Sequence, residues 1–458
     1  MKGKGTSTLA FYGGAGSVTG ANFLLKTEDI SILVDCGLQQ DKRICHECNY
    51  DDFAYDPASV DVLFVTHAHL DHIGRIPKLV ADGFKGVIYS TPSTREITEV
   101  MFEDGVGIMA EEARKLGREP LYTAKDAKAA LALWKTLNYH ETLEFAPGYE
   151  VYLKDAGHIL GSTMFEITHN GKKIVFTGDL GNSPTPLLRD TEEVTDATYM
   201  VMESVYGDRN HESNMQERSK LFRDVVRQAV GRGGVLMIPV FSIERTQVIL
   251  HELNHLVEEN KIPSVPVFLD SPLAIKVTEI YEKHIKNFKK NIQEEIQAGD
   301  NIFDFPRLEL TLTKEESKGI EEIHGPKIIL AGSGMSYGGR VMFHERAYLS
   351  HPDSTILFVG YQVPGTPGRQ IQDGNKYVEI FDKKVPVRAH VESISGFSAH
   401  KDSDHLIEFA GKTADSVKTI FVAMGEEKSS NFLAQRLTDY YEIKTEVPHE
   451  GQIFNLEF

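Results

Sequence analysis

The most informative segment of the sequence is Val62-Leu63-Phe64-Val65-Thr66-His67-Ala68-His69-Leu70-Asp71-His72. Its four apolar residues are typical of a short buried strand. Three imidazoles and a carboxylate follow within six residues, so we expect metal-ligating side chains at the carboxyl end of a strand, where ligand sites of α/β proteins are found. Imidazole nitrogens suit zinc and a carboxylate suits a harder ion, so the segment predicts a site for one or two metal ions.

Two later residues offer ligands of the same kind. His158 follows a strand expected over 150–153, and Asp179 follows a strand expected over 173–177. Both therefore lie at strand ends, where they could bind metal together with the histidine segment.

The remaining pattern predicts an α/β fold with an inserted domain. Short strands and glycine turns fill the first sixty residues, and helical composition covers 94–118 and 124–138. From about residue 208 helices and strands alternate, which is typical of parallel α/β units. Strands return after residue 385. We therefore expect a first domain formed by 1–207 and 386–458 and an inserted domain over 208–385.

The order HxHxDH, then Gly157-His158, then Thr177-Gly178-Asp179-Leu180-Gly181 resembles the metallo-β-lactamase superfamily. This resemblance implies an αβ/βα sandwich that holds two zinc ions at one edge of its sheets. It implies that one zinc is bound by His67, His69 and His158, that the second is bound by Asp71 and His72, and that Asp179 bridges them. Asp35 matches an aspartate that does not bind metal itself but orients the ligands through hydrogen bonds.

Two further segments resemble the β-CASP nucleases within that superfamily. Met202-Glu203-Ser204-Val205-Tyr206-Gly207-Asp208-Arg209 is similar to their acidic motif, and Gly396-Phe397-Ser398-Ala399-His400 is similar to their histidine motif. The resemblance covers essentially the whole chain and is to the short prokaryotic homologues of the endonuclease of mRNA 3′-end processing. It implies an inserted α/β β-CASP domain and a metal-dependent ribonuclease that hydrolyses single-stranded RNA in a cleft between the domains.

The resemblance also implies roles for individual residues in catalysis. Asp71, Glu203 and His400 are the expected catalytic residues, with His400 donating a proton to the leaving oxygen and Glu203 holding its imidazole. Two glycine-rich loops, 332–340 and 365–369, offer backbone amides for phosphate groups, although such loops are often only turns. The expected RNA-binding residues are Ser333, Gly334, Met335, Arg340, Gly365, Thr366 and Arg369.

One position departs from the β-CASP pattern. Met424 stands where that pattern has a further histidine ligand of the second zinc. A thioether is a poor zinc ligand, so the second ion is expected to bind weakly or to be manganese. An impaired enzyme acting as an RNA-binding scaffold is an alternative, as is a small-molecule metallo-hydrolase. Because Glu203 and His400 are present, we favour an active ribonuclease.

Composition limits the partners and the location of the protein. The 458 residues include 67 acidic and 49 basic side chains, for a net charge of −18, so any RNA site must be local. No apolar stretch approaches the roughly 20 residues of a membrane-spanning helix. Three cysteines (Cys36, Cys45 and Cys48) and an amino terminus without an apolar stretch predict a cytoplasmic protein. A homodimer is a family-level expectation, and endonuclease or 5′-exonuclease action and RNA or DNA preference stay open.

Overall fold

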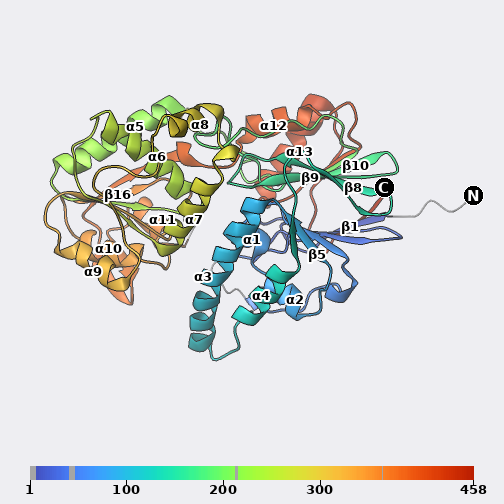
Figure 1. Ribbon diagram of the computed structural model, residues 1–458, viewed down its shortest axis with the longest axis horizontal. Helices are drawn as coiled ribbons and strands as arrows, with labels where there is room; N and C mark the ends of the chain where they lie inside the picture. Colours follow the sequence, from blue (N-terminus) through green and yellow to red (C-terminus); the bar gives the residue numbers. More distant parts are fainter. Residues whose placement is uncertain (1–6, 41–46, 212–214, 364) are drawn as a thin grey trace, which may run out of the picture. The chain divides into compact units, whose positions relative to one another are not determined.

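The computed structural model describes residues 7–40, 47–211, 215–363 and 365–458. The chain divides into two compact units, one comprising Met1–Asn210 and His400–Phe458 and the other comprising His211–Ala399. Figure 1 colours both units along the sequence. Cys45 lies outside the described residues, whereas Cys36 is buried and free. None of the helices in the described part of the chain is long and apolar enough to span a membrane.

The first unit contains two seven-stranded sheets. The first sheet has, in spatial order, the strands β22 (Ile453–Leu456), β1 (Ser7–Phe11), β2 (Phe23–Lys26), β3 (Ser31–Val34), β4 (Val62–Phe64), β5 (Val87–Ser90) and β6 (Trp134–Thr136). The second has β21 (Thr445–Glu446), β20 (Thr419–Val422), β11 (Tyr199–Met202), β10 (Lys172–Phe176), β9 (Thr163–His169), β8 (Tyr149–Asp155) and β7 (Thr142–Ala146). The helices of this unit are α1 (Leu70–Ile73), α2 (Ile76–Ala81), α3 (Pro92–Leu116), α4 (Ala124–Ala132), α12 (Ser403–Gly411) and α13 (Glu427–Tyr441).

Alternating side chains of the second sheet explain the layering of this unit. Ile174 and Phe176 of β10 face a core shared with the first sheet, whereas Val175 between them faces a core shared with α12 and α13. Successive side chains of a strand point to opposite faces, so an apolar strand buries both faces of its sheet. Helices α2, α3 and α4 lie along the first sheet (Figure 1). The expected αβ/βα sandwich is therefore confirmed.

The second unit is built on a six-stranded parallel sheet. Its strands, in spatial order, are β14 (Leu308–Leu310), β13 (Val267–Asp270), β15 (Lys327–Ala331), β12 (Val235–Pro239), β16 (Thr355–Phe358) and β19 (His390–Ser393). A separate hairpin pairs β17 (Tyr377–Ile380) with β18 (Lys383–Pro386). The helices are α5 (Met215–Gly231), α6 (Arg245–Glu258), α7 (Pro272–Lys283), α8 (Lys290–Gln297), α9 (Lys314–Glu322), α10 (Val341–Tyr348) and α11 (Pro367–Gln372).

Two details differ from the sequence expectations. The helix expected over 124–138 ends at Ala132, because Trp134–Thr136 instead forms strand β6, which pairs with β5. The indole of Trp134 donates a hydrogen bond to Ser90 Oγ at 2.8 Å, a tertiary contact that helical composition does not reveal. The strand expected after residue 385 is present as β19, but it pairs with β16 of the second unit. The compact first unit therefore resumes at His400, later than the expected domain boundary at 386.

Candidate metal centre

The expected metal ligands follow the carboxyl ends of strands in the first unit. His67 comes after β4, His158 after β8 and Asp179 after β10, while Asp71 and His72 lie on α1. The turn that carries Asp179 requires glycine at residue 178. Its φ is +55°, and a Cβ there would lie 2.7 Å from Thr66 Cβ. The sequence Thr177-Gly178-Asp179 therefore brings the carboxylate directly to the histidine segment.

Three imidazoles and one carboxylate converge in the first group of ligands. His69 Nδ1 lies 3.1 Å from His67 Nε2 and 3.2 Å from His158 Nε2. Asp179 Oδ2 lies 3.4 Å from His67 Nε2 and 3.5 Å from His158 Nε2. His67, His158 and Asp179 are buried. Three nitrogens and one oxygen at this spacing form a four-ligand set of the kind that zinc prefers.

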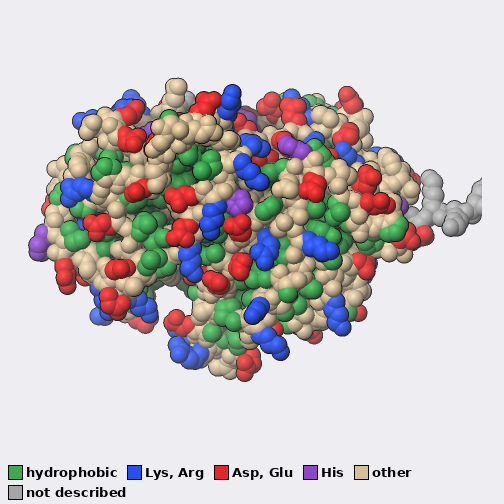
Figure 2. All heavy atoms as spheres, viewed as in Figure 1, with side chains coloured by type: hydrophobic (Ala, Val, Ile, Leu, Met, Phe, Trp, Pro, Cys, Tyr) green, Lys and Arg blue, Asp and Glu red, His purple; other side chains and the backbone are tan. Residues whose placement is uncertain are grey.

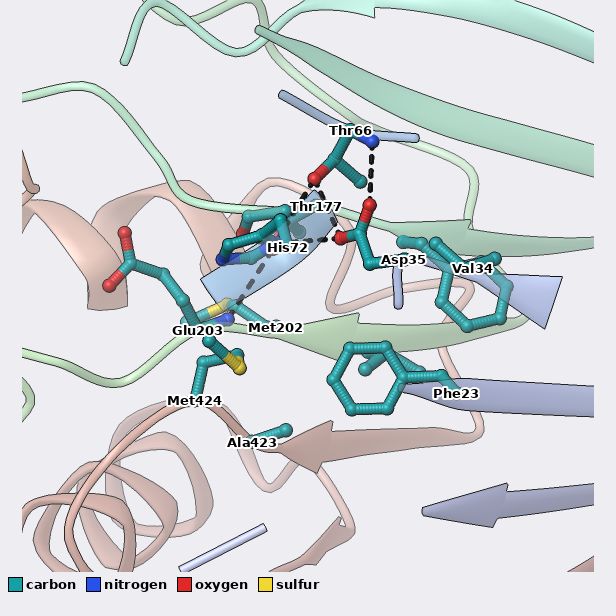
Figure 3. Close-up of a pocket in the computed structure, with 13 residues that line it drawn as sticks. Phe23, Val34, Asp35, Thr66, His72, Thr177, Met202, Glu203, Ala423 and Met424 are labelled. Carbon is teal, nitrogen blue, oxygen red and sulfur yellow. Dashed lines mark hydrogen bonds and ion pairs between the residues drawn. The ribbon is translucent and has the colours of Figure 1, made fainter. Parts of the chain in front are cut away.

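A second group shares the same carboxylate. The other oxygen of Asp179, Oδ1, lies 3.4 Å from His72 Nε2, and Asp71 Oδ2 lies 3.9 Å from that nitrogen. The ring of His72 is oriented from behind, because its Nδ1 lies 2.7 Å from Asp35 Oδ2. Thr66 donates to both oxygens of Asp35, at 2.8 Å from its backbone N and 2.7 Å from its hydroxyl. Figure 3 shows this network of Asp35, Thr66 and His72.

Two buried atoms at the centre lack hydrogen bonds. They are His72 Nε2 and Asp179 Oδ1. In the neutral tautomer of His72 whose Nδ1 proton Asp35 accepts, Nε2 presents a lone pair to a carboxylate oxygen, an arrangement that is unfavourable without positive charge between them. A divalent cation supplies that charge. The residues therefore fit a metal centre in which Asp179 faces both ligand groups.

The pKa values of the candidate ligands in the absence of metal agree with a metal centre. Burial and the neighbouring rings lower the pKa of both His69 and His158 well below the ordinary value, so both imidazoles are neutral, as ligands must be. Burial also opposes charge on His72, but Asp179 and Asp35 outweigh it and raise its pKa well above the ordinary value. Positive charge is thus favoured beside Asp179, whether a proton or a metal ion carries it.

Glu203 and His400 form a pair beside the ligands. His400 Nδ1 lies 3.2 Å from Glu203 Oε1 and 4.0 Å from Asp179 Oδ2. Glu203 is buried and accepts hydrogen bonds from the backbone amides of Leu180 at 2.7 Å and Val205 at 3.2 Å. Burial opposes the charge on His400, yet Glu203 and then Asp179 raise its pKa to about 9. The structure therefore brings together these two residues, which lie almost 200 positions apart in the sequence.

Met424 packs into the core between the sheets instead of joining the ligands. It is 3% exposed, and its sulfur lies so near Gly14 that a Cβ added there would be 2.4 Å from it. A cavity of about 10 Å³, with room for about one water molecule, is lined by Met424, His72 and Asp35 among others (Figure 3). Among the described residues, no hydrogen bond joins the thioether of Met424 to a proposed metal ligand.

The two glycine-rich loops of the second unit lie side by side. Gly368 N donates to Met335 O at 3.4 Å, and Gln362 Nε2 donates to Gly334 O at 2.9 Å. Ser333 Oγ donates to Tyr337 O, and Thr366 Oγ1 caps α11 by accepting from Arg369 N. Gly365 has a φ of +91°, which glycine adopts without strain. The loops thus form one local structure, as expected for neighbouring turns.

Both arginines expected to bind phosphate already have carboxylate partners. Arg340 Nη1 donates to Asp270 Oδ1 at 2.6 Å, and its guanidinium also binds the carbonyls of Thr311 and Leu312. Arg369 Nε donates to both oxygens of Asp373, at 2.8 and 3.0 Å. Asp270 is fully buried, so the Arg340 pair is part of the interior of the second unit. The backbone amides are therefore better candidates for phosphate contacts than the guanidinium groups.

A second group of potential ligands was missed from the sequence. His251, His255 and Glu295 come together in the second unit. The two histidines are four residues apart on α6, a spacing that places both on one helix face and is itself a signal for a metal site. Glu295 lies far along the chain on α8, so only the fold reveals the third member.

The surface gives no sign of a broad basic region on the face that Figure 2 draws. Side chains of Lys and Arg are interspersed with those of Asp and Glu across it. This agrees with the net charge of −18. Binding of a polyanion therefore has to rely on local groups.

Comparison with protein families gives three matches along the chain. The model of the metallo-beta-lactamase superfamily matches residues 16–227, and that of the Beta-Casp domain matches residues 246–371. The model of the Zn-dependent metallo-hydrolase RNA specificity domain matches residues 384–448. This last match begins near the expected boundary at 386, whereas the compact second unit extends to Ala399. The domain boundaries stay a prediction.

Individual proteins are similar over most of the chain. Ribonuclease TTHA0252 of Thermus thermophilus is 35% identical over 398 residues, which cover 87% of this chain and 89% of that protein. Transcription termination factor FttA of Methanosarcina mazei is 31% identical, over 94% of this chain and 69% of that protein. A solved structure of a protein of unknown function from Enterococcus faecalis V583 covers 98% of this chain and 100% of its own, with a TM-score of 0.58 and 12% identity. This last likeness concerns the fold alone.

Proposed function

Because the chain belongs to the Beta-Casp group of the metallo-β-lactamase superfamily, we propose that it is a metal-dependent ribonuclease that hydrolyses phosphodiester bonds of single-stranded RNA. The observation that carries this proposal is that the ligand group of His67, His69, His158 and Asp179 shares Asp179 with the group of Glu203 and His400. A metal centre with an adjoining carboxylate–imidazole pair provides what phosphodiester hydrolysis requires. The ribonuclease activity named for the Thermus relative supports the same reaction class.

We propose that the centre holds two zinc ions. His67, His69 and His158 would hold the first, Asp71 and His72 the second, and Asp179 would contact both, with the second site weaker or filled by manganese. When bound, the ions supply positive charge to the non-bridging phosphate oxygens and lower the pKa of the attacking water. Asp35 and Thr66 keep the ring of His72 in the orientation that points Nε2 at Asp179.

His400 is proposed to donate a proton to the leaving oxygen of the RNA. Its ring is held by Glu203, and Glu203 is in turn fixed by two backbone amides, so the imidazole keeps one orientation. An imidazolium beside a carboxylate is a suitable acid near neutral pH. Glu203 acts through His400 and is therefore a positioning residue in this proposal.

The proposal also includes the RNA contacts, the location and the oligomeric state of the protein. RNA phosphates would contact the backbone of loops 332–340 and 365–369, where anion-binding amides are typical. The sparse cysteines support a cytoplasmic location, and a homodimer is proposed from the family expectation alone. The alternative is an RNA-binding scaffold with weak catalysis, which the replacement of a histidine ligand by the thioether of Met424 favours.

The test is cleavage of a single-stranded RNA labelled at its 5′ end in one reaction and at its 3′ end in another. We expect cleavage with added zinc or manganese and none after chelation, restored when metal is returned. Labelled fragments of intermediate length from both labels would identify an endonuclease, and mononucleotides from the 5′ label a 5′-exonuclease. Intact RNA with every metal, together with retained RNA binding, would contradict the proposal and support the scaffold.

Met424→His is expected to strengthen the second metal site. Residue 424 has a φ of +45°, which histidine tolerates better than most residues, and it borders the cavity that His72 also lines. Metal content after dialysis should exceed that of the wild type by up to one ion per chain, and cleavage should need less added metal. Met424→Leu is the matched control, because it keeps the apolar packing without adding a ligand. An unchanged metal content in Met424→His would show that this side chain does not reach the second ion.

A further inference from the structure

Helix α6 carries two histidines on one face of the second unit. They lie in the segment His251-Glu252-Leu253-Asn254-His255, so the two imidazoles are four positions apart. Residues at this spacing are neighbours on a helix surface. The same spacing, with glutamate after the first histidine, is found where two histidines of one helix bind zinc in metallopeptidases.

The carboxylate of Glu295 on α8 completes a cluster of three ligand atoms. His251 Nε2 lies 3.0 Å from His255 Nε2. Glu295 Oε2 lies 3.6 Å from His251 Nε2 and 3.8 Å from His255 Nε2. Each of these separations is short enough for all three atoms to contact one ion, since Zn–N and Zn–O bonds are about 2 Å long.

The cluster is incompletely satisfied without a cation. Glu295 Oε2 is buried and has no hydrogen-bond partner, although it points at both rings. A buried carboxylate oxygen without a partner is costly, and buried polar groups in proteins are almost always satisfied. A cation between the two imidazole nitrogens and this oxygen would satisfy it.

We propose that His251, His255 and Glu295 form a zinc site of the second unit, separate from the metal centre of the first. A ligand set of two imidazoles and one carboxylate favours zinc over the harder magnesium and calcium ions, which prefer oxygen ligands. The side chains of His255 and Glu295 are 40% and 33% exposed, so an ion can enter from solvent. The ion would join α6 to α8, two helices otherwise distant in the sequence.

The role of this site is structural. In peptidases with this spacing, the glutamate next to the first histidine serves as the base. Here Glu252 Oε1 accepts a hydrogen bond from Arg218 Nη2 at 2.7 Å and another from Ser219 Oγ at 2.9 Å. Arg218 and Ser219 thus already use Oε1 of the carboxylate that serves as the base in those peptidases. The zinc would therefore stabilise the second unit without adding a peptidase activity.

Zinc content of the purified full chain tests this proposal. We compare the wild type with the double variant His251→Gln and His255→Gln, with Glu295→Gln, and with His324→Gln as the matched control. His324 is an exposed histidine of the same unit that is distant from this cluster in sequence. After dialysis against metal-free buffer, the double variant should contain one zinc per chain less than the wild type, and the control should match the wild type. Zinc should also raise the Tm of the wild type and the control by several degrees more than that of the double variant.

The outcomes are independent of the ribonuclease proposal. A double variant that loses one zinc while RNA cleavage is unchanged supports a separate site. Equal zinc content in wild type and a folded double variant overturns it, whatever the cleavage assay gives. Should the double variant fail to fold, Glu295→Gln decides, because it removes one ligand at the partly exposed side of the cluster and leaves α6 unchanged. Full zinc retention and an unchanged Tm response in Glu295→Gln would then overturn the proposal.

Discussion

Asp179→Asn is expected to abolish RNA cleavage and to release metal from both ligand groups. Each oxygen of this carboxylate faces a different group, Oδ2 toward His67 and His158 and Oδ1 toward His72. The amide has no negative charge, and its nitrogen repels a cation on one side. Metal ions contribute several kcal/mol of transition-state stabilisation, so we expect a loss of roughly 10³-fold or more in cleavage rate.

Metal content and cleavage rate measured on the same preparation check this prediction. The matched control is Asp415→Asn, because Asp415 is an exposed aspartate of the same unit. The control should keep the wild-type rate and metal content. If Asp179→Asn keeps both metal ions and the wild-type rate, the carboxylate is not a shared ligand and the proposed two-ion arrangement is wrong.

His400→Ala is expected to lower the rate of RNA cleavage by about 10²- to 10⁴-fold while leaving the metal content unchanged. The imidazole lies beside the ligands, and its closest partner is Glu203 and not a metal-ligating group. Loss of a proton donor affects the departure of the leaving oxygen, whereas the charge supplied by the ions stays. Glu203→Gln should show a smaller loss, because the ring remains but its orientation is less fixed.

A substrate with sulfur in place of the leaving oxygen separates this role from a structural one. A thiolate leaves without a proton, so His400→Ala should cleave this substrate at nearly the wild-type rate. His449→Ala, at an exposed histidine of the same unit, is the control and should behave as the wild type with both substrates. An equal defect of His400→Ala on both substrates would exclude proton donation and assign His400 to positioning.

The sequence predicts the fold class, and it places the candidate ligands of the first unit near one another for a physical reason. His67, His69, Asp71 and His72 occupy one short segment after an apolar strand, so their proximity hardly depends on the rest of the fold. Asp179 is predictable because it follows an apolar strand and the glycine before it permits a tight turn there. The pairing of Glu203 with His400 depends on distant strands and entered only through the family resemblance.

The partners of several candidate site residues could not be predicted from the sequence, because most of them come from distant parts of the chain. Arg340 and Arg369 follow glycine-rich loops, yet the carboxylates that neutralise them, Asp270 and Asp373, are identified only by the fold. Met424 occupies a ligand position in the sequence pattern, but its side chain is drawn into apolar packing beside Gly14. The third ligand of the cluster on α6 is likewise supplied by a separate helix.

The order of the site residues along the chain has a consequence for biosynthesis. Every proposed ligand of the metal centre in the first unit precedes residue 180, whereas His400 and the strands β20 and β22 are translated only after the whole second unit. Strand β20 pairs with β11, and β22 pairs with β1, so the two sheets reach their full width only when the last residues have left the ribosome. A nascent chain can therefore acquire metal well before it holds a proton donor. Until His400 has been translated, the emerging polypeptide lacks the proton donor proposed for RNA cleavage.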